Sequence, residues 1–493
     1  MGCEPGSAIG CVLENSYDAL RAIFGAWWLG STVVSLPRKP RRMEATEYAN
    51  DLASLIKCSN VCLLLAESPP QMPGTAAVAR YDELPAATET VSAHAWREDE
   101  VVLLQHSSGS AGRPKGCELT TQAVHAQLAM LTERLTFSAR ETIVTWLPLS
   151  HDMGLFGALL LAFKSGARLA LGTPQRFALA PGTWLEDCAA LGATLTLGPN
   201  FAVDIAARVA SRRAPGALGD LRTWVVGAEH TRAETLSRAA SVLAAAGAAT
   251  DTLSPAYGLA EATLCVTMHA PGEAPTTQTV SVRGLAEGRV EPARSGAPGA
   301  WTVVSAGHPL AGASVQVVGE GAPSGVPAGE VRVRSPSLAR GYRNNAAATR
   351  ATFVSGELRT GDQGFVADGL LYLTGRLDGL LLVNGRSLPA EPVESRVAQA
   401  LGTKARSCAV VQTPDTGRLA LLIEPARDSH PPRTLTGAAR AAIATFDFAV
   451  DSYSLVGAGQ MPRTPSGKVR RARCREIAFD DAALRSVGGR RVA

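Results

Sequence analysis

The spacing of apolar residues near the start of the chain is that of a helix. Apolar side chains recur every three or four positions, at Tyr17, Leu20, Ile23, Phe24 and Trp27. This period predicts an amphipathic helix that turns one apolar stripe toward a core. The apolar residues of 128–135 predict a second helix in the same way.

Shorter apolar runs of strand length alternate with these helical segments. They cover residues 61–65, 169–171, 194–197 and 224–226. Parallel strands need a crossover between them, and that crossover is usually a helix. The alternation therefore predicts α/β layers with largely parallel sheets.

The pattern changes from Val303 onward. Residues 315–318 and 330–334 alternate apolar and polar positions between Gly- and Pro-containing turns, which predicts a β-rich subdomain. The Gly-, Pro-, Ala- and Thr-rich stretch 271–298 is interpreted as an exposed connection. A last unit, roughly 379–493, has its own apolar runs at 380–383, 409–411 and 419–423.

Composition changes this picture little. The chain has 493 residues, of which 46% are hydrophobic and 19% charged, and these values are typical of a globular protein of more than one domain. A net charge of +4 gives no reason to expect a nucleic-acid partner. The Arg-rich stretch 470–475 is interpreted as a solvated face.

Cysteine usage and hydropathy indicate a cytoplasmic protein. The nine cysteines are scattered, and no second close pair completes a zinc site with Cys58 and Cys62, so reduced thiols are expected. The apolar stretch 24–37 is interrupted and too short to cross a bilayer, so no stable membrane insertion is expected. No charged region and cleavage site precede it, so no signal peptide is expected either. The sequence does not indicate an oligomeric state.

Residues 107–116 carry the strongest local signal for chemistry. The segment Ser-Ser-Gly-Ser-Ala-Gly-Arg-Pro-Lys-Gly follows the strand-like run 101–104. Small residues let the backbone approach a ligand closely, while hydroxyl and N–H groups bind phosphate oxygens and Lys115 adds a positive charge. Because Pro114 precedes the lysine and Gly116 follows it, the segment is not a Walker loop.

This segment resembles the phosphate-binding signature of the adenylate-forming superfamily, which includes acyl-CoA synthetases, amino-acid adenylation domains, luciferases and fatty acyl-AMP ligases. The other motifs of that superfamily follow in order. Their ranges are 146–155 (WLPLSHDMGL), 199–202 (PNFA), 227–229 (GAE), 257–261 (YGLAE), 359–362 (RTGD), 375–378 (GRLD) and 465–468 (PSGK). The His-Asp-Met-Gly and Asn-Phe-Ala forms, and Ala260 where many relatives have Thr, are similar to the fatty acyl-AMP ligase subgroup.

The resemblance implies a fold and a domain division. It implies an α/β fold with a large N-terminal region, residues 1–377, of two stacked α/β subdomains plus a β-rich subdomain. A small mobile C-terminal α+β domain, residues 378–493, would follow a hinge at Asp378. The resemblance also implies formation of an acyl-adenylate from ATP, Mg²⁺ and a fatty or other hydrophobic carboxylic acid. The acyl group would then pass to the phosphopantetheine thiol of an acyl carrier protein.

The resemblance assigns site residues one by one. The implied catalytic residues are Lys468, Glu261 and His151, with Glu261 also as the metal ligand. Substrate binding is implied for His151, Asn200 and Phe201. Binding of ATP or AMP is implied for Ser107, Ser108, Gly109, Ser110, Gly112, Lys115, Gly227, Ala228, Glu229, Tyr257, Gly258, Leu259, Asp362 and Arg376.

These residue types suit the reaction. A carboxylate must approach the α-phosphate of ATP, so catalysis is mainly positioning and charge neutralisation. Glu261 offers the oxygen ligand that Mg²⁺ prefers, and Asp362 can accept hydrogen bonds from both ribose hydroxyls. Tyr257 is suited to stacking on adenine, and Lys468 to stabilising the charge that develops between carboxylate and phosphate.

Two departures from the family pattern leave alternatives open. Relatives usually carry Thr where Ala111 stands, and residues 384–390 match no subgroup well. One alternative is an acyl-CoA synthetase that completes a CoA thioester. The other is a degenerate adenylase that only binds a nucleotide or a partner.

Overall fold

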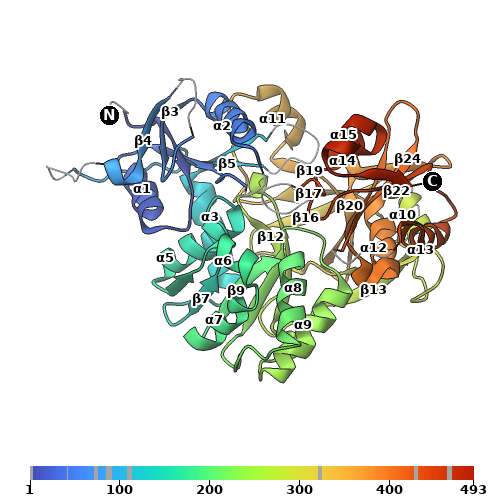
Figure 1. Cartoon of the computed structure of the whole chain (residues 1–493). Coiled ribbons are helices and arrows are strands. Elements are labelled where there is room, and N and C mark those ends of the chain that lie inside the picture. The colour runs from blue at the N-terminus through green and yellow to red at the C-terminus, as the bar shows by residue number, and fades with distance from the viewer. Residues whose placement is uncertain are drawn as a thin grey trace.

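The computed structural model describes residues 4–40, 43–70, 76–84, 91–107, 114–319, 325–426, 431–463 and 469–492. In Figure 1 the blue N-terminal sheet lies above the green second sheet, and the orange and red C-terminal elements lie to their right. The α/β fold expected from the alternating apolar runs is confirmed, with a β-rich part and a smaller C-terminal domain after it.

The first sheet is parallel except at one edge. Its strand order is β4-β3-β1-β2-β5-β6, and only the pairing of β5 with β6 is antiparallel. Helix α1 (Tyr17–Trp28) begins after Ser16, whose hydroxyl accepts from Ala19 N–H at 3.2 Å. The strands are Ala8–Val12 (β1), Thr32–Leu36 (β2), Val61–Ala66 (β3), Ala77–Arg80 (β4), Val101–His106 (β5) and Gly116–Thr120 (β6).

Helix α1 is confirmed, and the expected apolar stripe packs against the core except at Tyr17. The side chains that it buries fully are Ile23 and three alanines, at positions 19, 22 and 26. Tyr17 is 77% exposed. The helix packs closely against the first sheet through small residues, and the large aromatic side chains lie toward its margins.

The second sheet carries parallel strands whose carboxyl ends share one edge. Its order is β15-β12-β11-β10-β9-β7-β8, and the part from β11 to β8 is parallel. The apolar runs expected to be strands form β8, β9 and β10. The strands are Thr142–Thr145 (β7), Arg168–Leu171 (β8), Leu195–Pro199 (β9), Thr223–Gly227 (β10), Leu253–Gly258 (β11), Cys265–Met268 (β12) and His308–Pro309 (β15).

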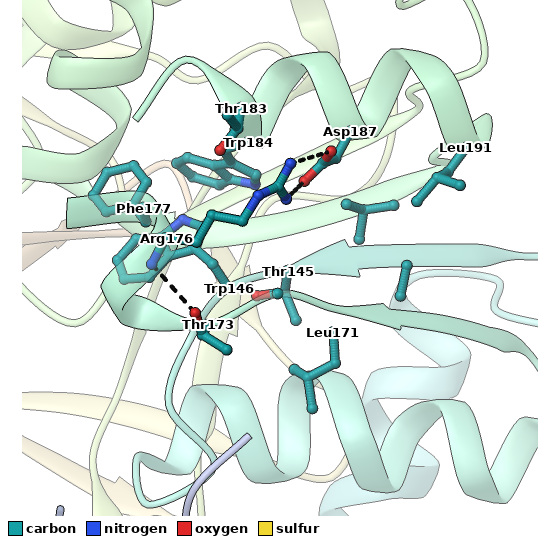
Figure 2. A pocket seen from close by; sticks show the side chains of 13 residues that line it. Thr145, Trp146, Leu171, Thr173, Arg176, Phe177, Thr183, Trp184, Asp187 and Leu191 are labelled. Carbon is teal, nitrogen blue, oxygen red and sulfur yellow. Dashed lines mark hydrogen bonds and ion pairs between the residues drawn. The ribbon is translucent and has the colours of Figure 1, made fainter. Parts of the chain in front are cut away.

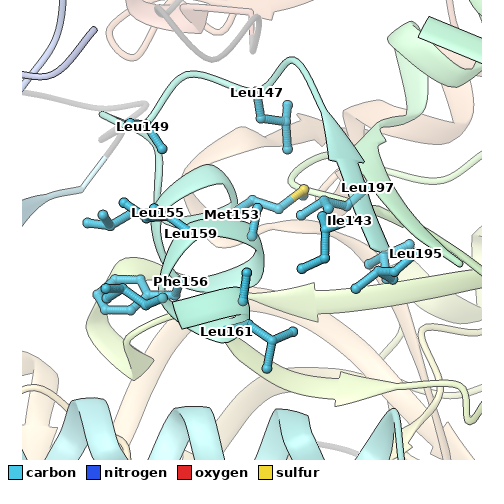
Figure 3. Close-up of a cluster of buried hydrophobic side chains, with 14 of the residues drawn as sticks. Ile143, Leu147, Leu149, Met153, Leu155, Phe156, Leu159, Leu161, Leu195 and Leu197 are labelled. Atoms are coloured by element: carbon cyan, nitrogen blue, oxygen red, sulfur yellow. The ribbon is translucent and has the colours of Figure 1, made fainter. Parts of the chain in front are cut away.

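Helices cover both faces of the second sheet. Figure 3 shows the helical segment from Met153 to Leu161 packed against Ile143, Leu195 and Leu197. In chain order, the helices after α1 and up to strand β11 are α2 (Ala45–Ser59), α3 (Thr121–Arg134), α4 (Asp152–Gly154), η2 (Leu155–Leu160), α5 (Leu161–Ser165), α6 (Pro174–Leu179), α7 (Thr183–Leu191), α8 (Asn200–Ala210) and α9 (Ala233–Ala245).

Antiparallel strands follow, as the alternating pattern predicts. They pair in the order β16-β17-β19-β18, with β20 beside β19. In the sequence, helix α11 (Ala346–Thr352) falls between strands β17 and β18. The strands are Ser314–Val318 (β16), Gly329–Arg334 (β17), Phe353–Val354 (β18), Glu357–Ala367 (β19) and Leu370–Arg376 (β20).

The interpretation of residues 271–298 as an exposed connection is wrong. The segment contains strand β13 (Thr277–Ser281) and helix α10 (Val282–Ala286), and β13 pairs with β14 (Ala300–Val304). Val280, Val282 and Leu285 are each 1% exposed. The few apolar residues among many small and polar ones are therefore the ones that anchor this segment to the core.

The C-terminal elements begin with a tight hairpin. Strands β21 (Leu380–Val383) and β22 (Arg386–Pro389) are joined by Asn384 and Gly385, whose φ angles are +51° and +75°. Two consecutive residues with positive φ are the requirement of a type I′ turn, and Asn-Gly is its preferred sequence.

The C-terminal domain contains a four-stranded sheet with the strand order β23-β24-β25-β26. Helix α12 contacts β23, and α14 contacts β23 and β24. The elements are α12 (Ala390–Leu401), β23 (Ala405–Gln412), β24 (Leu419–Pro425), α13 (Pro432–Ala444), β25 (Ser452–Leu455), α14 (Arg471–Phe479), α15 (Asp481–Ser486) and β26 (Arg490–Val492).

Arg471 contradicts the interpretation of 470–475 as a solvated face. Its guanidinium contacts Glu394 at 2.6 Å and Glu391 at 3.1 Å, and the Arg471 side chain is 19% exposed. Two carboxylates on the first turns of α12 thus hold the start of α14. A charge run in a sequence does not reveal that one of its members faces two acids from another helix.

Among the described residues, no helix combines the length and the apolar content needed to cross a membrane. Free thiols are found at Cys11, Cys58, Cys117, Cys188, Cys265, Cys408 and Cys474.

We predict that Arg471→Ala destabilises the protein and Arg473→Ala does not. Removing one partner of a buried ion pair leaves an uncompensated charge and costs about 3 kcal/mol of unfolding free energy. The guanidinium of Arg473 also contacts a carboxylate, Glu476, but on the exposed side of the same helix, so its loss should change that free energy by less than about 0.5 kcal/mol. Urea unfolding of both variants measures the difference. Equal unfolding midpoints would contradict the role assigned to Arg471.

Candidate active site

Tyr257 and Asp362 meet where β11 ends beside β19. The Tyr257 hydroxyl donates to Asp362 Oδ2 at 2.6 Å, and Arg376 Nη1 donates to Asp362 Oδ1 at 3.1 Å. Arg376 also contacts Asp378 at 3.1 Å. Strands β19 and β20 place Asp362 directly opposite Arg376 in the register of the hairpin. Three motifs that are far apart in the sequence therefore converge on one carboxylate.

The charges of this cluster support one another. Burial raises the pKa of Tyr257 well above its ordinary value, and the Asp362 carboxylate raises it further, so the phenol stays neutral and donates. Burial alone would lower the pKa of Arg376, but the carboxylates of Asp362 and Asp378 more than offset that effect. The result is a neutral donor and a fixed cation on either side of Asp362.

Glu261 lies close by and is held by Tyr342. The Tyr342 hydroxyl donates to Glu261 Oε1 at 2.8 Å, and Ala339 N–H donates to the Glu261 carbonyl at 2.8 Å. The ammonium of Lys115 lies 4.8 Å from the centre of the Tyr342 ring. A cation at this distance over an aromatic face is attracted by the ring. One tyrosine therefore links the carboxylate of one motif to the lysine of another.

Glu261 offers a carboxylate oxygen of the kind that Mg²⁺ binds. Within the described part of the chain, no three His, Cys, Asp or Glu side chains form a group that could hold a metal ion. Mg²⁺ usually binds one or two carboxylates together with the phosphates of a substrate. Glu261, held by Tyr342, offers one such carboxylate, and Lys115 contacts the ring of the same tyrosine.

Gly258 and Leu259 shape the turn between Tyr257 and Glu261. A β-carbon at Gly258 would lie 1.6 Å from the carbonyl oxygen of Leu264, so only glycine fits there. Leu259 precedes the short helix η4 (Ala260–Ala262), and its carbonyl accepts from Ala262 N–H at 2.9 Å.

The PNFA and GAE motifs touch each other at the carboxyl ends of β9 and β10. Gly227 is in register with Pro199 across the two strands. The Glu229 carboxylate accepts from the backbone N–H of Phe201, and Asn200 Oδ1 accepts from Arg232 N–H at 3.0 Å. The turn between them uses Ala228 in the left-handed region, with φ +67°.

The loop between β7 and α4 is held by the first sheet through Asn15. Asn15 Nδ2 donates to the carbonyls of Leu147 at 3.0 Å and Gly172 at 2.7 Å, and Asn15 Oδ1 accepts from Leu149 N–H at 3.0 Å. Gly154 closes the loop, because a β-carbon there would lie 2.3 Å from the carbonyl oxygen of Pro148.

His151 lies at the end of this loop and caps α4. Its Nδ1 accepts from Met153 N–H at 3.3 Å and lies 2.6 Å from Asp152 Oδ1. The His151 side chain is 21% exposed. It therefore retains access to the edge of the sheet where the other motifs end.

The phosphate-binding segment is closed at its base. Ser107 N–H donates to the Lys115 carbonyl at 2.9 Å, and Lys115 N–H lies 3.4 Å from Ser107 Oγ. Five of the predicted site residues lie outside the described residues: Ser108, Gly109, Ser110, Gly112 and Lys468.

A separate cavity of about 200 Å³ opens beside β7 and β8 (Figure 2). Trp146 stacks on Phe177 with ring centres 3.9 Å apart, and Arg176 pairs with Asp187 at the rim. Trp184 packs against Gly198 of β9. The preceding residue, Leu197, packs near Gly157 on the other face of the sheet. Since neighbouring strand residues point to opposite faces, this cavity lies across the sheet from Met153.

The sequence motifs missed several residues that build the site. Tyr342 belongs to no motif recognised above, although it links Glu261 to Lys115. Asn15 likewise had no signal, because an isolated asparagine after a strand is ordinary turn chemistry. Both act through contacts with residues more than 80 positions away, which no local pattern records.

The chain is similar to known proteins over most of its length. The family model described as "AMP-binding enzyme" matches residues 1–343. The medium-chain-fatty-acid–[acyl-carrier-protein] ligase JamA of Moorena producens is 30% identical over 503 residues, covering 93% of this chain and 83% of that protein. The long-chain-fatty-acid–AMP ligase FadD28 of Mycobacterium tuberculosis is 30% identical over 425 residues, covering 78% of this chain and 71% of that protein.

A solved structure extends the similarity to three dimensions. The fatty acyl-adenylate ligase of L. pneumophila, in complex with acyl adenylate and pyrophosphate, matches with a TM-score of 0.72 and 25% identity. The match covers 97% of this chain and 88% of that one. From the family match over residues 1–343, the relatives at 30% identity and the shared fold, we conclude that this chain belongs to the AMP-binding enzyme family.

Proposed function

We propose that this protein activates a fatty or other hydrophobic carboxylic acid as its acyl-adenylate, with release of pyrophosphate. A carboxylate oxygen attacks the α-phosphorus of ATP, and the bond to the β-phosphate breaks. The acyl group then passes to the phosphopantetheine thiol of an acyl carrier protein, and AMP leaves. Relatives named as an acyl-carrier-protein ligase and as a fatty-acid–AMP ligase support the substrate class and the acceptor.

The observation that carries this proposal is the pair of linked contacts around the end of β11. Tyr257, Asp362 and Arg376 form one set, and Glu261, Tyr342 and Lys115 form the other. A nucleotide needs acceptors for its ribose hydroxyls and a cation for its phosphates, and the two sets supply these side by side. A surface ion pair or a core tyrosine would not require both.

These contacts support roles for Asp362, Lys115 and His151, and the PSGK motif supports one for Lys468, which lies outside the described residues. Asp362, fixed between a phenol and a guanidinium, presents its carboxylate to the ribose hydroxyls. Lys115 places positive charge near the departing phosphates. His151, at the carboxyl edge of the sheet, borders the space where the acid approaches. Lys468 would stabilise the charge shared between acid and α-phosphate.

Mg²⁺ would be held by Glu261 together with the phosphates of ATP, and it would supply charge neutralisation. Tyr342 would orient the Glu261 carboxylate through its hydrogen bond. Burial and the neighbouring Glu261 raise the pKa of Tyr342, so its hydroxyl remains a donor at neutral pH.

We further propose that residues 1–377 and 378–493 move relative to each other about Asp378. Asp378 lies in the short helix η5 (Leu377–Gly379) between the two parts. The side chain of Arg376 contacts Asp378 on one side and Asp362 on the other, which places the junction next to the nucleotide residues. Closure about a short junction is a common way to assemble a site from two domains.

Two other activities remain distinct outcomes. An acyl-CoA synthetase would use the same adenylate but pass it to coenzyme A. The hairpin at Asn384 and Gly385 lies in the domain that would present the acceptor, so it does not by itself select between the two thiols. A binding-only protein would keep the nucleotide contacts without turnover.

Acid-dependent exchange of pyrophosphate is the first expected result. Purified protein with ATP and Mg²⁺ should incorporate labelled pyrophosphate into ATP when a medium-chain or long-chain fatty acid is added, and not in its absence. A panel that also holds short and aromatic acids defines the preferred class. Stabilisation by ATP without exchange for any acid would reject catalysis and favour the binding-only protein.

Asp362→Asn and Lys468→Ala should impair different steps. Asp362→Asn removes the negative charge and one of the two acceptor oxygens that Tyr257, Arg376 and the ribose would share, and should raise the KM for ATP roughly tenfold or more. Loss of Lys468 should lower kcat roughly 100-fold while the KM for ATP changes little. Asp368→Asn on the exposed β19–β20 turn and Lys164→Ala on the exposed side of α5 are the matched controls. Full kcat in Lys468→Ala would remove this residue from the mechanism.

The acceptor is tested by product analysis. With a responsive acid and ATP, a phosphopantetheinylated carrier should become acylated over many turnovers, whereas coenzyme A should leave acyl-AMP as the main product. Rapid acyl-CoA formation without accumulation of acyl-AMP would favour the synthetase and leave adenylation intact.

A further inference from the structure

His106 is held on both sides of its imidazole ring just before the phosphate-binding segment. Its Nδ1 lies 3.2 Å from the Ser35 carbonyl oxygen on β2, and its Nε2 lies 3.1 Å from Ser59 Oγ at the end of α2. The residue that follows it in the chain, Ser107, closes the base of the segment against Lys115.

The two contacts fix the tautomer of the ring. A backbone carbonyl can only accept, so Nδ1 carries the proton, and Nε2 then accepts from the Ser59 hydroxyl. Burial lowers the pKa of His106, which favours this neutral form. Ser59 is fully buried, and the His106 ring is the nearer of the two printed partners of its hydroxyl, since Cys58 Sγ lies 3.8 Å away.

The same strand pair also holds the loop that carries His151. The Ser35 hydroxyl donates to the Ser150 carbonyl at 3.2 Å, and Gln105 Nε2 donates to the same oxygen at 3.0 Å. Ser35 and Gln105 are in register across β2 and β5. Ser35 thus receives a hydrogen bond from the residue before the phosphate-binding segment and gives one to the residue before His151.

This network has a geometric consequence. The acid side and the phosphate side must be held within a few tenths of an ångström of a reactive arrangement, and buried, satisfied polar networks provide such rigidity. Asn15 holds the same loop at Leu147 and Leu149, and Ser35 and Gln105 hold it at Ser150. Ser35 and His106 connect the two loops through side chains.

We propose that His106 is a positioning residue that fixes the start of the phosphate-binding segment relative to the His151 loop. It touches no substrate; it acts through Ser107 on one side and through Ser35 on the other. This inference rests on the proposed adenylation, because it assigns phosphate binding to the segment that begins at Ser107.

The test uses variants of His106 that separate the effect of the planar ring from the effect of its hydrogen bonds. His106→Phe keeps a planar ring but removes both hydrogen bonds of the imidazole, to the Ser35 carbonyl and to the Ser59 hydroxyl. His106→Asn keeps a short donor toward Ser35. The matched control is His125→Phe, an exposed histidine on α3 outside the network. Dissociation constants for ATP come from calorimetry, and KM and kcat come from acid-dependent pyrophosphate exchange.

We expect His106→Phe to weaken ATP binding roughly tenfold and to raise the KM for ATP by a similar factor. His106→Asn should recover most of that loss, and His125→Phe should match the unmodified protein. Measurements are made well below each variant's melting temperature.

Two results would overturn the inference. If His106→Phe only lowers the melting temperature and keeps ATP binding and KM unchanged, the histidine is structural and the positioning role is rejected while adenylation stands. If the unmodified protein neither binds ATP nor exchanges pyrophosphate, the proposed function fails, and this inference fails with it.

Discussion

The arrangement of the site depends on how one irregular loop, residues 147–151, is fixed between two sheets. Its backbone groups have no strand partner, and unpaired buried groups are costly. Asn15 satisfies both Leu147 and Leu149, while Ser35 and Gln105 satisfy Ser150. The first sheet therefore determines where the acid-side motif of the second sheet lies. Without these side-chain contacts, the edge of parallel strands would have no defined relation to the phosphate-binding segment.

The second requirement is convergence of charge. Asp362 lies on β19, which belongs to a different sheet from β11, the strand that carries Tyr257. The hairpin of β19 and β20 places a guanidinium beside this carboxylate, so the acid is stabilised before any nucleotide arrives. Preorganised groups of this kind do not have to rearrange when the ligand binds, which is why they favour catalysis.

The sequence predicted the α/β layers because their strands are continuous apolar runs at regular separation. The motifs and their order could be recognised because each motif is a short run of consecutive residues. It could not predict the partner of Glu261, because Tyr342 is 81 positions away. It also misjudged Arg471 and the segment around Val280, where burial is decided by elements far along the chain. Short sequence motifs thus indicate the chemistry, and tertiary contacts determine the geometry of the site.

The glycines of the motifs record something different from the charged residues beside them. Gly154 and Gly258 are required because backbone oxygens of Pro148 and Leu264 occupy the space of a side chain. Neither requirement involves a nucleotide. A descendant that lost its activity would still need both glycines in order to fold, whereas it could lose the exposed Lys115 at little cost in stability. In such a lineage, loss of activity would be visible as substitution of charged residues in motifs whose glycines are kept.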